Sequence, residues 1–418
     1  MAADAQRMIA ELRELAQLTG TERGAQRLAW TDTWARAREW ERHLLAELPV
    51  EVEIDEAGNQ WATLRGASPE AVIIGSHIDS VPDGGWLDGC LGVLAALEVM
   101  RAIAAESTPP LTVRLVDWAD EEGARFSLSL LGSMAAAGEI DPEFVGNLRD
   151  AEGMTAREAL ASHGVDIETM GRARAQLRSA VAYIELHIEQ GPVLEDRCLP
   201  LAVVTGTYGV ERWSARFDGQ TAHAGSTPMD QRRDALLAAA RLALEVRELA
   251  RTRGGVGTVG RIHAEPGIPT AVAGVATALV DQRHVDTETL RELHEQAEAA
   301  SRAIAAEERV DVTWSPLARI APIPFDPEFI EAAAAIVADL QGNDVRLPSG
   351  PLHDAARIAE AGVPTVMLFV RSKRGLSHTR EEDSDEADLT LALTALERLV
   401  RHTLDGGITS AGARVTGP

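Results

Sequence analysis

Four short apolar segments, each ending in histidine or acidic residues, constrain the fold of this chain more than any other feature. These segments cover residues 71–77, 111–122, 182–191 and 363–378. A long apolar helical pattern follows the first of them, and such alternation of strands with helices is typical of an α/β domain with a mostly parallel sheet. Ligands of these sheets bind beyond the carboxyl ends of the strands. The polar residues are therefore expected to meet at one edge of the sheet.

Five of these polar residues have side chains that bind transition metals. Imidazoles and carboxylates together are the ligand set of Zn²⁺ and similar ions. The five candidate ligands are His77, Asp88, Glu122, His187 and His378. Asp79 is predicted to support them by accepting the second N–H of the His77 imidazole. Glu121 directly precedes Glu122, and adjacent residues at a strand end point in different directions, so one carboxylate can bind metal while the other stays free as a base.

Less specific interpretations exist for each of these residues taken alone. A single histidine at a strand end is usually not a ligand, and a Glu-Glu pair in a chain with 65 acidic residues is usually solvated surface. The metal interpretation depends on all five residues falling at one sheet edge. Cys90 could be mistaken for a nucleophile, but its place at the start of a core-facing helix predicts a packed thiol.

The middle of the chain follows a different pattern. From 209 to 322 the predicted elements are strand, helix (233–252), two strands (255–263 and 270–283), helix (287–306) and strand. This β-α-β-β-α-β order is the ferredoxin-like arrangement. We therefore predict a discontinuous main domain, 1–208 with 323–418, and an α+β domain inserted at 209–322.

Charge and composition exclude several classes of function. The 418 residues include 65 acidic and 40 basic side chains, a formal net charge of −25. This charge disfavours binding to nucleic acid or to anionic membranes. No apolar stretch approaches the ~20 residues of a membrane span. Two cysteines, Cys90 and Cys198, cannot build a disulfide framework, so a cytoplasmic location is expected.

Five blocks of the sequence resemble the signatures of a known enzyme group. They are GSHIDSVPDGGWLDGCLGVLAALE (75–98), DEEGARFSLSLLGS (120–133), HIEQGPVLE (187–195), FDGQTAHAGSTPMDQRRDAL (217–236) and LFVRSKRGLSH (368–378). In this order and spacing they are similar to the N-carbamoyl-L-amino-acid hydrolase, allantoate amidohydrolase and β-ureidopropionase group. That group belongs to the di-metal M20 peptidase family.

The resemblance implies two divalent metal ions per subunit, Zn, Mn, Co or Ni, and a role for each matching residue. Asp88 matches the bridging carboxylate, His77 and His187 match the ligands of one metal, and Glu122 and His378 match those of the other. Glu121 matches the general base. Gln190 and Arg283 match substrate-contacting positions, and Arg283 would hold a carboxylate of the substrate. His223 matches a histidine of the lid that reaches the partner subunit's active site, which implies that the inserted domain is a lid and the surface of a homodimer.

Three departures from the family pattern leave the substrate open. Gly267 and Thr270 stand where the lid usually has asparagines, Pro351-Leu352 replaces small residues, and Arg371 replaces a proline. None of these changes affects the metal ligands or Glu121.

The leading prediction is hydrolysis of the ureido group of N-carbamoyl-L-amino acids to the amino acid, CO₂ and ammonia. Allantoate hydrolysis and cleavage of another N-acyl amino acid are the alternatives. A catalytically silent dimeric binding protein on the same scaffold is the most distant one.

Overall fold

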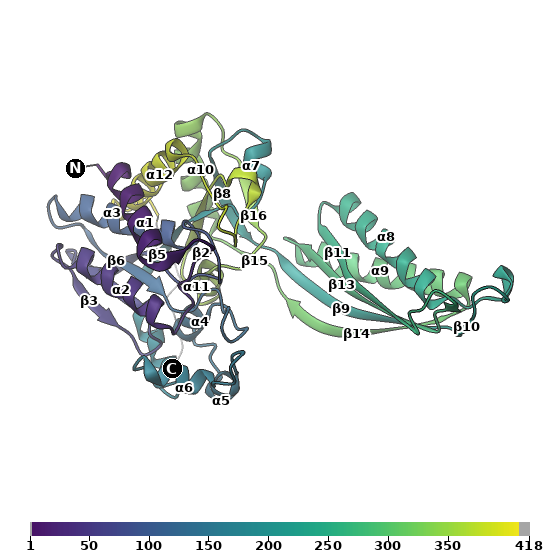
Figure 1. Cartoon of the computed structure of the whole chain (residues 1–418). Helices are drawn as coiled ribbons and strands as arrows, with labels where there is room; N and C mark the ends of the chain where they lie inside the picture. Colours follow the sequence, from purple (N-terminus) through teal and green to yellow (C-terminus); the bar gives the residue numbers. More distant parts are fainter. Residues whose placement is uncertain (1, 409–418) are drawn as a thin grey trace. The chain divides into compact units, whose positions relative to one another are not determined.

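The computed structural model describes residues 2–408, and its contacts divide the chain into two compact units (Figure 1). The first unit joins the chain up to Thr205 with the chain from Phe325 onward. The second unit is Gly206–Pro324. Among the described residues, no helix combines the length and the apolar character needed to span a membrane.

Four parallel strands form the centre of the main sheet in the first unit. They are β5 (Ser68–His77), β6 (Leu111–Trp118), β7 (Ala180–Ile188) and β17 (Thr365–Val370). They lie in the order β17-β7-β5-β6 and all three pairings are parallel. Their inner residues are buried without alternation, which requires both faces of the sheet to be covered. The prediction of parallel strands at the four apolar segments is confirmed.

Antiparallel strands extend this centre on both sides, so the nine-stranded sheet is mixed. Beside β6 lie β4 (Gln60–Leu64) and then β3 (Glu51–Ile54). Beside β17 lie β8 (Leu201–Thr207), β15 (Ile323–Pro324) and β16 (Arg346–Ser349). The prediction of a mostly parallel sheet holds for the centre only, because β3, β4, β8 and β15 pair antiparallel with their neighbours.

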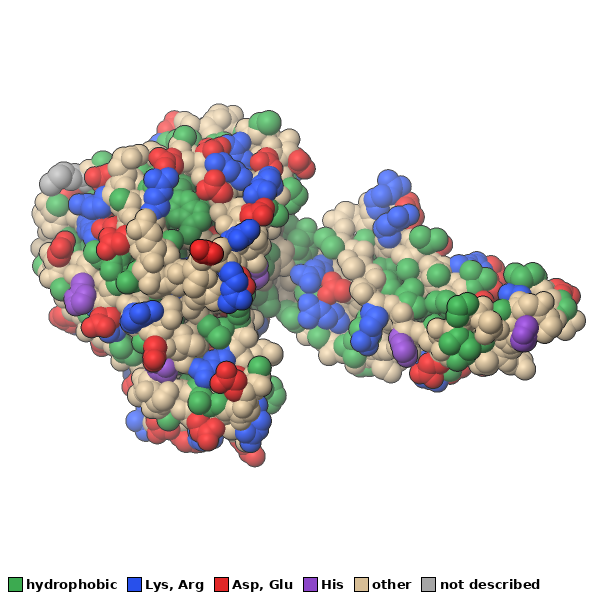
Figure 2. All heavy atoms as spheres, viewed as in Figure 1, with side chains coloured by type: hydrophobic (Ala, Val, Ile, Leu, Met, Phe, Trp, Pro, Cys, Tyr) green, Lys and Arg blue, Asp and Glu red, His purple; other side chains and the backbone are tan. Residues whose placement is uncertain are grey.

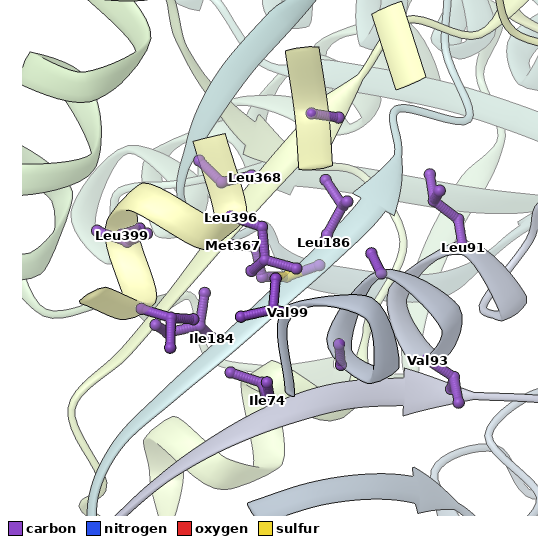
Figure 3. Packing of buried hydrophobic residues seen from close by; sticks show 14 of the residues in the cluster. Ile74, Leu91, Val93, Val99, Ile184, Leu186, Met367, Leu368, Leu396 and Leu399 are labelled. Atoms are coloured by element: carbon purple, nitrogen blue, oxygen red, sulfur yellow. The ribbon is translucent and has the colours of Figure 1, made fainter. Parts of the chain in front are cut away.

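Long helices cover the central strands. The helix α3 (Cys90–Ala104) contacts β5, β6 and β7, and α12 (Glu386–Leu404) contacts α3 and β17. Figure 3 shows Val99 of α3 and Leu396 of α12 among Ile184 and Met367 of the strands. Three further helices complete this layer: α1 (Ala5–Thr19), α2 (Asp32–Leu45) and α10 (Pro327–Gln341).

Close packing fixes where α3 begins. A Cβ atom at Gly92 would lie 2.5 Å from the carbonyl oxygen of Leu186 and 2.6 Å from Cβ of Ser76. Only glycine therefore lets the first turn of α3 approach the sheet this closely. The loop that precedes α3, with Asp88 in it, is held against the strand ends as a result.

Short helices and turns form the remaining parts of the first unit. Trp30, Trp34, Phe126 and Leu160 belong to a separate hydrophobic cluster. The short elements are β1 (Gly20–Thr21), β2 (Gly24–Ala25), α4 (Leu131–Ala137), α5 (Pro142–Asn147), α6 (Ala156–Ser162), η1 (Met170–Leu177), α7 (Val193–Asp196), α11 (Asp354–Glu360) and η3 (Lys373–Gly375).

The second unit is a four-stranded antiparallel sheet with two helices. The chain order is β9 (Gly209–Asp218), α8 (Ala235–Arg253), β11 (Val256–Glu265), β13 (Val275–His284), α9 (Thr287–Glu308) and β14 (Asp311–Ile320). The strands lie in the order β11-β13-β9-β14. Both helices contact the sheet, and alternate strand residues such as Phe217 and Ala278 are buried in a core of their own. This is the predicted β-α-β-β-α-β arrangement.

The strand predicted over 270–283 is interrupted, which the sequence pattern did not indicate. It consists of β12 (Ala271–Val272) and β13, and β12 pairs with β10 (Ala222–His223) instead of the main sheet. The break falls at Gly274, where a Cβ atom would lie 2.3 Å from Oγ1 of Thr221. Beside β10, the turn η2 (Met229–Gln231) leads into α8.

Candidate metal centre

The carboxyl ends of the four central strands bring the five predicted ligands together in the first unit. His77 ends β5, His187 lies near the end of β7, Glu122 follows β6 and His378 follows β17. Asp88 lies in the loop between β5 and α3. We call these five residues the ligand cluster. The sequence analysis predicted that these residues meet at one edge of the sheet, and in the structure they lie at the carboxyl ends of the central strands.

Distances within the ligand cluster centre on Asp88. Its Oδ1 lies 3.2 Å from Nε2 of His187, and its Oδ2 lies 3.3 Å from Nε2 of His378. Nε2 of His378 is also 3.3 Å from Oε2 of Glu122. Two groups result, each with its ligand atoms within 4.8 Å of one another: His77 with Asp88 and His187, and Asp88 with Glu122 and His378. Asp88 belongs to both groups, so its carboxylate could bridge two ions.

The backbone orients two of the imidazoles. Nδ1 of His77 lies 3.0 Å from the carbonyl oxygen of Asp79, and Nδ1 of His187 lies 2.9 Å from that of Ile188. A carbonyl only accepts, so each Nδ1 carries a hydrogen, and in the neutral ring each Nε2 has a lone pair to offer to a metal ion. The buried Nε2 of His187 has no hydrogen-bond partner among the described residues. A lone pair held beside a carboxylate without a donor fits a bound cation.

Asp79 supports His77 in a different way from the one predicted. The acceptor for the imidazole N–H is the backbone oxygen of Asp79, and its Oδ1 is 3.7 Å from Nδ1. The side chain of Asp79 instead accepts from the backbone N–H groups of Glu121 and Glu122, both at 3.1 Å. Asp79 therefore fixes the turn that separates these two carboxylates.

Negative charge is crowded at the ligand cluster. Burial raises the pKa of Glu122 to about 8, and repulsion from Asp88 adds to this shift. The hydrogen bond to Asp88 raises the pKa of His378 to about 9. For His187, burial alone would lower the pKa, but the Asp88 carboxylate outweighs it and the pKa is raised to about 9. The cluster attracts positive charge, and a divalent cation would supply it.

Glu121 lies beside the ligand cluster without belonging to either group. Its Oε2 is 3.6 Å from Nε2 of His77, and its Oε1 is 4.0 Å from Nδ1 of His353. Burial raises the pKa of Glu121 well above its ordinary value, and the neighbouring carboxylate of Glu122 raises it further. A buried carboxylate with free oxygens next to a cation site can accept and return a proton.

A hydrogen-bond network supports Asp88 from the other side. Nε2 of Gln190 donates to Oδ2 of Asp88 at 2.9 Å, and Oγ of Ser377 lies 2.9 Å from both Oδ2 of Asp88 and Oε2 of Glu382, so its single hydrogen serves one of the two at a time. Glu382 accepts from the backbone N–H groups of Leu87 and Asp88 at 3.0 and 2.9 Å. The predicted substrate contact Gln190 thus binds Asp88 in this structure, and the sequence analysis missed Ser377 and Glu382.

His353 is another residue that the sequence analysis missed as part of the site. It is buried, and neither ring nitrogen has a hydrogen-bond partner among the described residues. Its ring centroid is 4.3 Å from that of His187. The backbone N–H of Ala355 donates to Oε2 of Glu185 at 3.1 Å, which anchors the turn that carries His353. The adjacent His353 and Asp354, shortly after Ser349, are the sequence feature that could have marked His353 as a candidate for the site.

The remaining predicted site residues lie in the second unit. His223 is exposed on β10, and its Nδ1 accepts from the backbone N–H groups of Gly225 and Ser226 at 3.1 Å. Nε of Arg283 donates to Oδ1 of Asp281 at 2.8 Å.

Two residues outside the site have structural roles, and for Cys90 the prediction of a packed thiol is confirmed. Cys90 is buried, and burial raises the pKa of its thiol to about 12, which makes it a poor nucleophile. Arg371 forms ion pairs with Asp385 and Asp388 at 3.0 and 2.7 Å.

Comparison with known proteins identifies the family of this chain. The sequence model of peptidase family M20/M25/M40 matches residues 73–402, most of the chain. The chain belongs to this family. It is 35% identical over 387 residues to the N-carbamoyl-L-amino acid amidohydrolase of Geobacillus stearothermophilus, covering 92% of this chain and 94% of the relative. It is 33% identical over 379 residues to the allantoate amidohydrolase of Escherichia coli (strain K12), covering 89% and 91%.

A solved structure supports the same assignment of this M20 chain. An amidase of the hydantoinase/carbamoylase family from Burkholderia multivorans superposes with a TM-score of 0.87 at 32% identity, covering 96% of this chain and 98% of that one. The ligand cluster, from His77 to His378, falls within the residues that match the family model.

The raised pKa values predict how metal binding depends on pH. Glu122 and His378 bind protons more tightly in the folded chain than unfolded. The metal-free protein should therefore lose the stabilisation from Glu122 as the pH rises from about 4.5 to 8, and that from His378 as it rises from about 6.5 to 9. A divalent cation replaces these protons. The increase in melting temperature produced by added Mn²⁺ should therefore grow over the same pH ranges.

Paired variants check the site of this effect. Asp88→Asn should remove most of the Mn²⁺-dependent increase, whereas Asp339→Asn, at an exposed ion pair with Arg398, should keep it. An equal increase in the Asp88→Asn protein would place the metal elsewhere.

Proposed function

We propose that this protein is a metal-dependent amidohydrolase that cleaves the ureido group of N-carbamoyl-L-amino acids. One observation carries the proposal: three histidines and two carboxylates converge on one point, with His77, Asp88 and His187 buried, His378 exposed to solvent and Glu121 beside them. That the chain is an amidohydrolase enzyme of the M20 family is established by the family match and the relatives. Choosing the ureido substrate goes further, and the carbamoyl hydrolases among the relatives support it.

The residues present fit two divalent cations, Zn, Mn, Co or Ni. His77 and His187 would hold one ion, Glu122 and His378 the other, and Asp88 would bridge them. Bound there, the cations would supply Lewis-acid polarisation of the scissile carbonyl. The Nε2 lone pairs of the imidazoles, fixed by the backbone bonds of Nδ1, suit this role.

Glu121 handles the proton in the proposed reaction. It takes a proton from the water that attacks the ureido carbon and returns it to the amino acid nitrogen as the C–N bond breaks. The carbamate that is released decomposes to CO₂ and ammonia. Burial raises the pKa of Glu121, which makes its carboxylate a stronger acceptor for the proton of the attacking water.

Gln190 of the first unit and two residues of the second unit complete the proposal. Arg283 would hold the substrate carboxylate through its planar guanidinium, Gln190 would contact substrate beside Asp88, and His223 would donate to the developing oxyanion in the partner subunit's site. The second unit would thereby act as lid and as the surface of a homodimer. The replacements Gly267 and Thr270 lie in this unit and bear on substrate choice.

Allantoate is the second candidate substrate, because allantoate amidohydrolases are among the relatives at 31–33% identity. Its ureido groups and carboxylate present the same chemistry to the site. Another N-acyl amino acid would lack the second ureido nitrogen. A catalytically silent dimeric binding protein is less favoured, because the ligand cluster and Glu121 are both intact.

Turnover of a substrate panel tests the proposal. With Mn²⁺, Co²⁺, Zn²⁺ or Ni²⁺ added, kcat/KM should be highest for N-carbamoyl-L-amino acids, compared with allantoate, 3-ureidopropionate and N-acetyl-L-amino acids. Glu121→Gln should keep its metal and lower kcat by about 10²-fold or more, because the amide cannot shuttle a proton. Glu381→Gln, at an exposed ion pair, is the matched control.

Three results would contradict parts of this assignment. A higher kcat/KM for allantoate would select the second candidate. No hydrolysis of any compound by metal-loaded protein would favour the binding protein. A Glu121→Gln protein with more than about a tenth of wild-type kcat would exclude Glu121 as the base.

Mixed dimers test whether His223 serves the partner's site. His223→Ala and Glu121→Gln place their lesions on different units, so a heterodimer would contain one site with both residues intact. Random reassociation gives about half heterodimers, each with one whole site of two, so about a quarter of wild-type activity should return. Failure to recover activity after verified subunit exchange would mean that His223 does not act in the partner.

A further inference from the structure

The first unit has a second cavity, separate from the ligand cluster. It measures about 130 Å³ and is lined by α2, by Ile54 at the end of β3 and by His163 and Val165 after α6. Figure 1 shows α2 and β3 in the dark purple part of this unit. This volume is slightly smaller than the roughly 150 Å³ of an apolar cavity that accommodates benzene, so the cavity is on the scale of a single small ring.

Aromatic rings form one wall of the cavity. The ring centroids of Trp30 and Trp34 are 4.8 Å apart, and the His163 ring lies 6.1 and 5.7 Å from them. Trp30 is fixed because its Nε1 donates to Oδ2 of Asp120 at 2.7 Å. The rings are inclined to one another by 60 to 72°, so they offer both faces and edges to a small apolar ring.

Positive charge lines the same cavity. Trp34, Arg38 and Arg42 follow one another at four-residue intervals along α2, so they share one face of that helix. Arg42 donates to Oε1 of Gln60 at 3.0 Å, and the described residues give it no ion pair. No acidic residue lines the cavity, although the chain carries a net charge of −25.

Two buried donors at this cavity lack an acceptor. Nε1 of Trp34 and Nη2 of Arg38 have no hydrogen-bond partner among the described residues. Both residues are buried, with 2% and 4% of their surface exposed. The rest of Arg38 is held, because Nη1 donates to the carbonyl oxygen of Gly58 and Nε lies 2.7 Å from Oδ2 of Asp117. Unpaired buried donors are costly, so an acceptor-rich ligand is the expected complement.

We propose that this cavity binds a small aromatic carboxylate, a ligand outside the proposed hydrolysis. Its ring would lie against Trp30, Trp34 and His163, and its carboxylate would bind the guanidinium of Arg42. The carboxylate would accept hydrogen bonds from donors that line the cavity, and the ring would pack against the apolar side chains of its wall. A neutral ring would form no charge-assisted bond with Arg42, whose electrostatic partner is the buried Glu41, and an aliphatic anion would leave the aromatic wall unused.

Titration calorimetry with benzoate on the metal-loaded full-length protein tests this proposal. Benzoate should bind saturably with a dissociation constant at or below about 1 mM. Benzamide, the neutral analogue, should bind at least about tenfold more weakly because it forms no charge-assisted bond. Arg42→Gln should weaken benzoate binding by a similar factor.

Arg36→Gln is the matched control, because Arg36 lies on the same helix, is exposed and does not line the cavity. It should bind benzoate as the wild type does. Absence of saturable binding to the wild type would overturn the proposal. Equal benzoate affinity of the wild-type and Arg42→Gln proteins would also overturn it. Benzoate would then bind at another place, such as the proposed active site. Equal melting temperatures of the two variants verify that the fold is intact, and none of these readouts requires hydrolysis.

Discussion

The central physical constraint in this protein is the concentration of buried negative charge around Asp88. Its two carboxylate oxygens face different histidines, and Glu121, Glu122 and Glu382 lie close by. Carboxylates this near to one another cannot all remain charged in a buried site without a compensating cation. The raised pKa values of Glu122 and Glu382, about 8 and about 7, express that cost. A site that binds divalent cations is the simplest structural solution.

The fold meets this constraint by fixing the backbone next to each ligand. Glu382 holds the N–H groups of Leu87 and Asp88, and Asp79 holds those of Glu121 and Glu122. The carbonyl oxygens of Asp79 and Ile188 orient the imidazoles. Gly85 permits the approach of Glu382, because a Cβ atom there would lie 2.0 Å from its Oε1. Acidic and basic side chains are interspersed on the face shown in Figure 2, whereas those of the ligand cluster and its supports are mostly buried.

Sequence patterns predicted the parts of this architecture that follow from local periodicity. His77 and His187 were predictable because each ends a buried parallel strand, and such strands converge at one edge. The break at Gly274 was not, because it depends on the contact with Thr221 from a distant part of the chain. His353 was missed because the strand before its turn has only four residues and little apolar pattern. Asp79 was placed correctly, but the choice between its backbone and side chain as acceptor depends on three-dimensional geometry.

The most direct test of the central claim is anomalous diffraction from crystals of the protein soaked in Zn²⁺ at pH 8. The account predicts two anomalous peaks about 3.5 to 4 Å apart with the Asp88 carboxylate between them. One peak should contact His77 and His187, and the other Glu122 and His378. No peak at the ligand cluster, or peaks that Asp88 does not contact, would contradict the account.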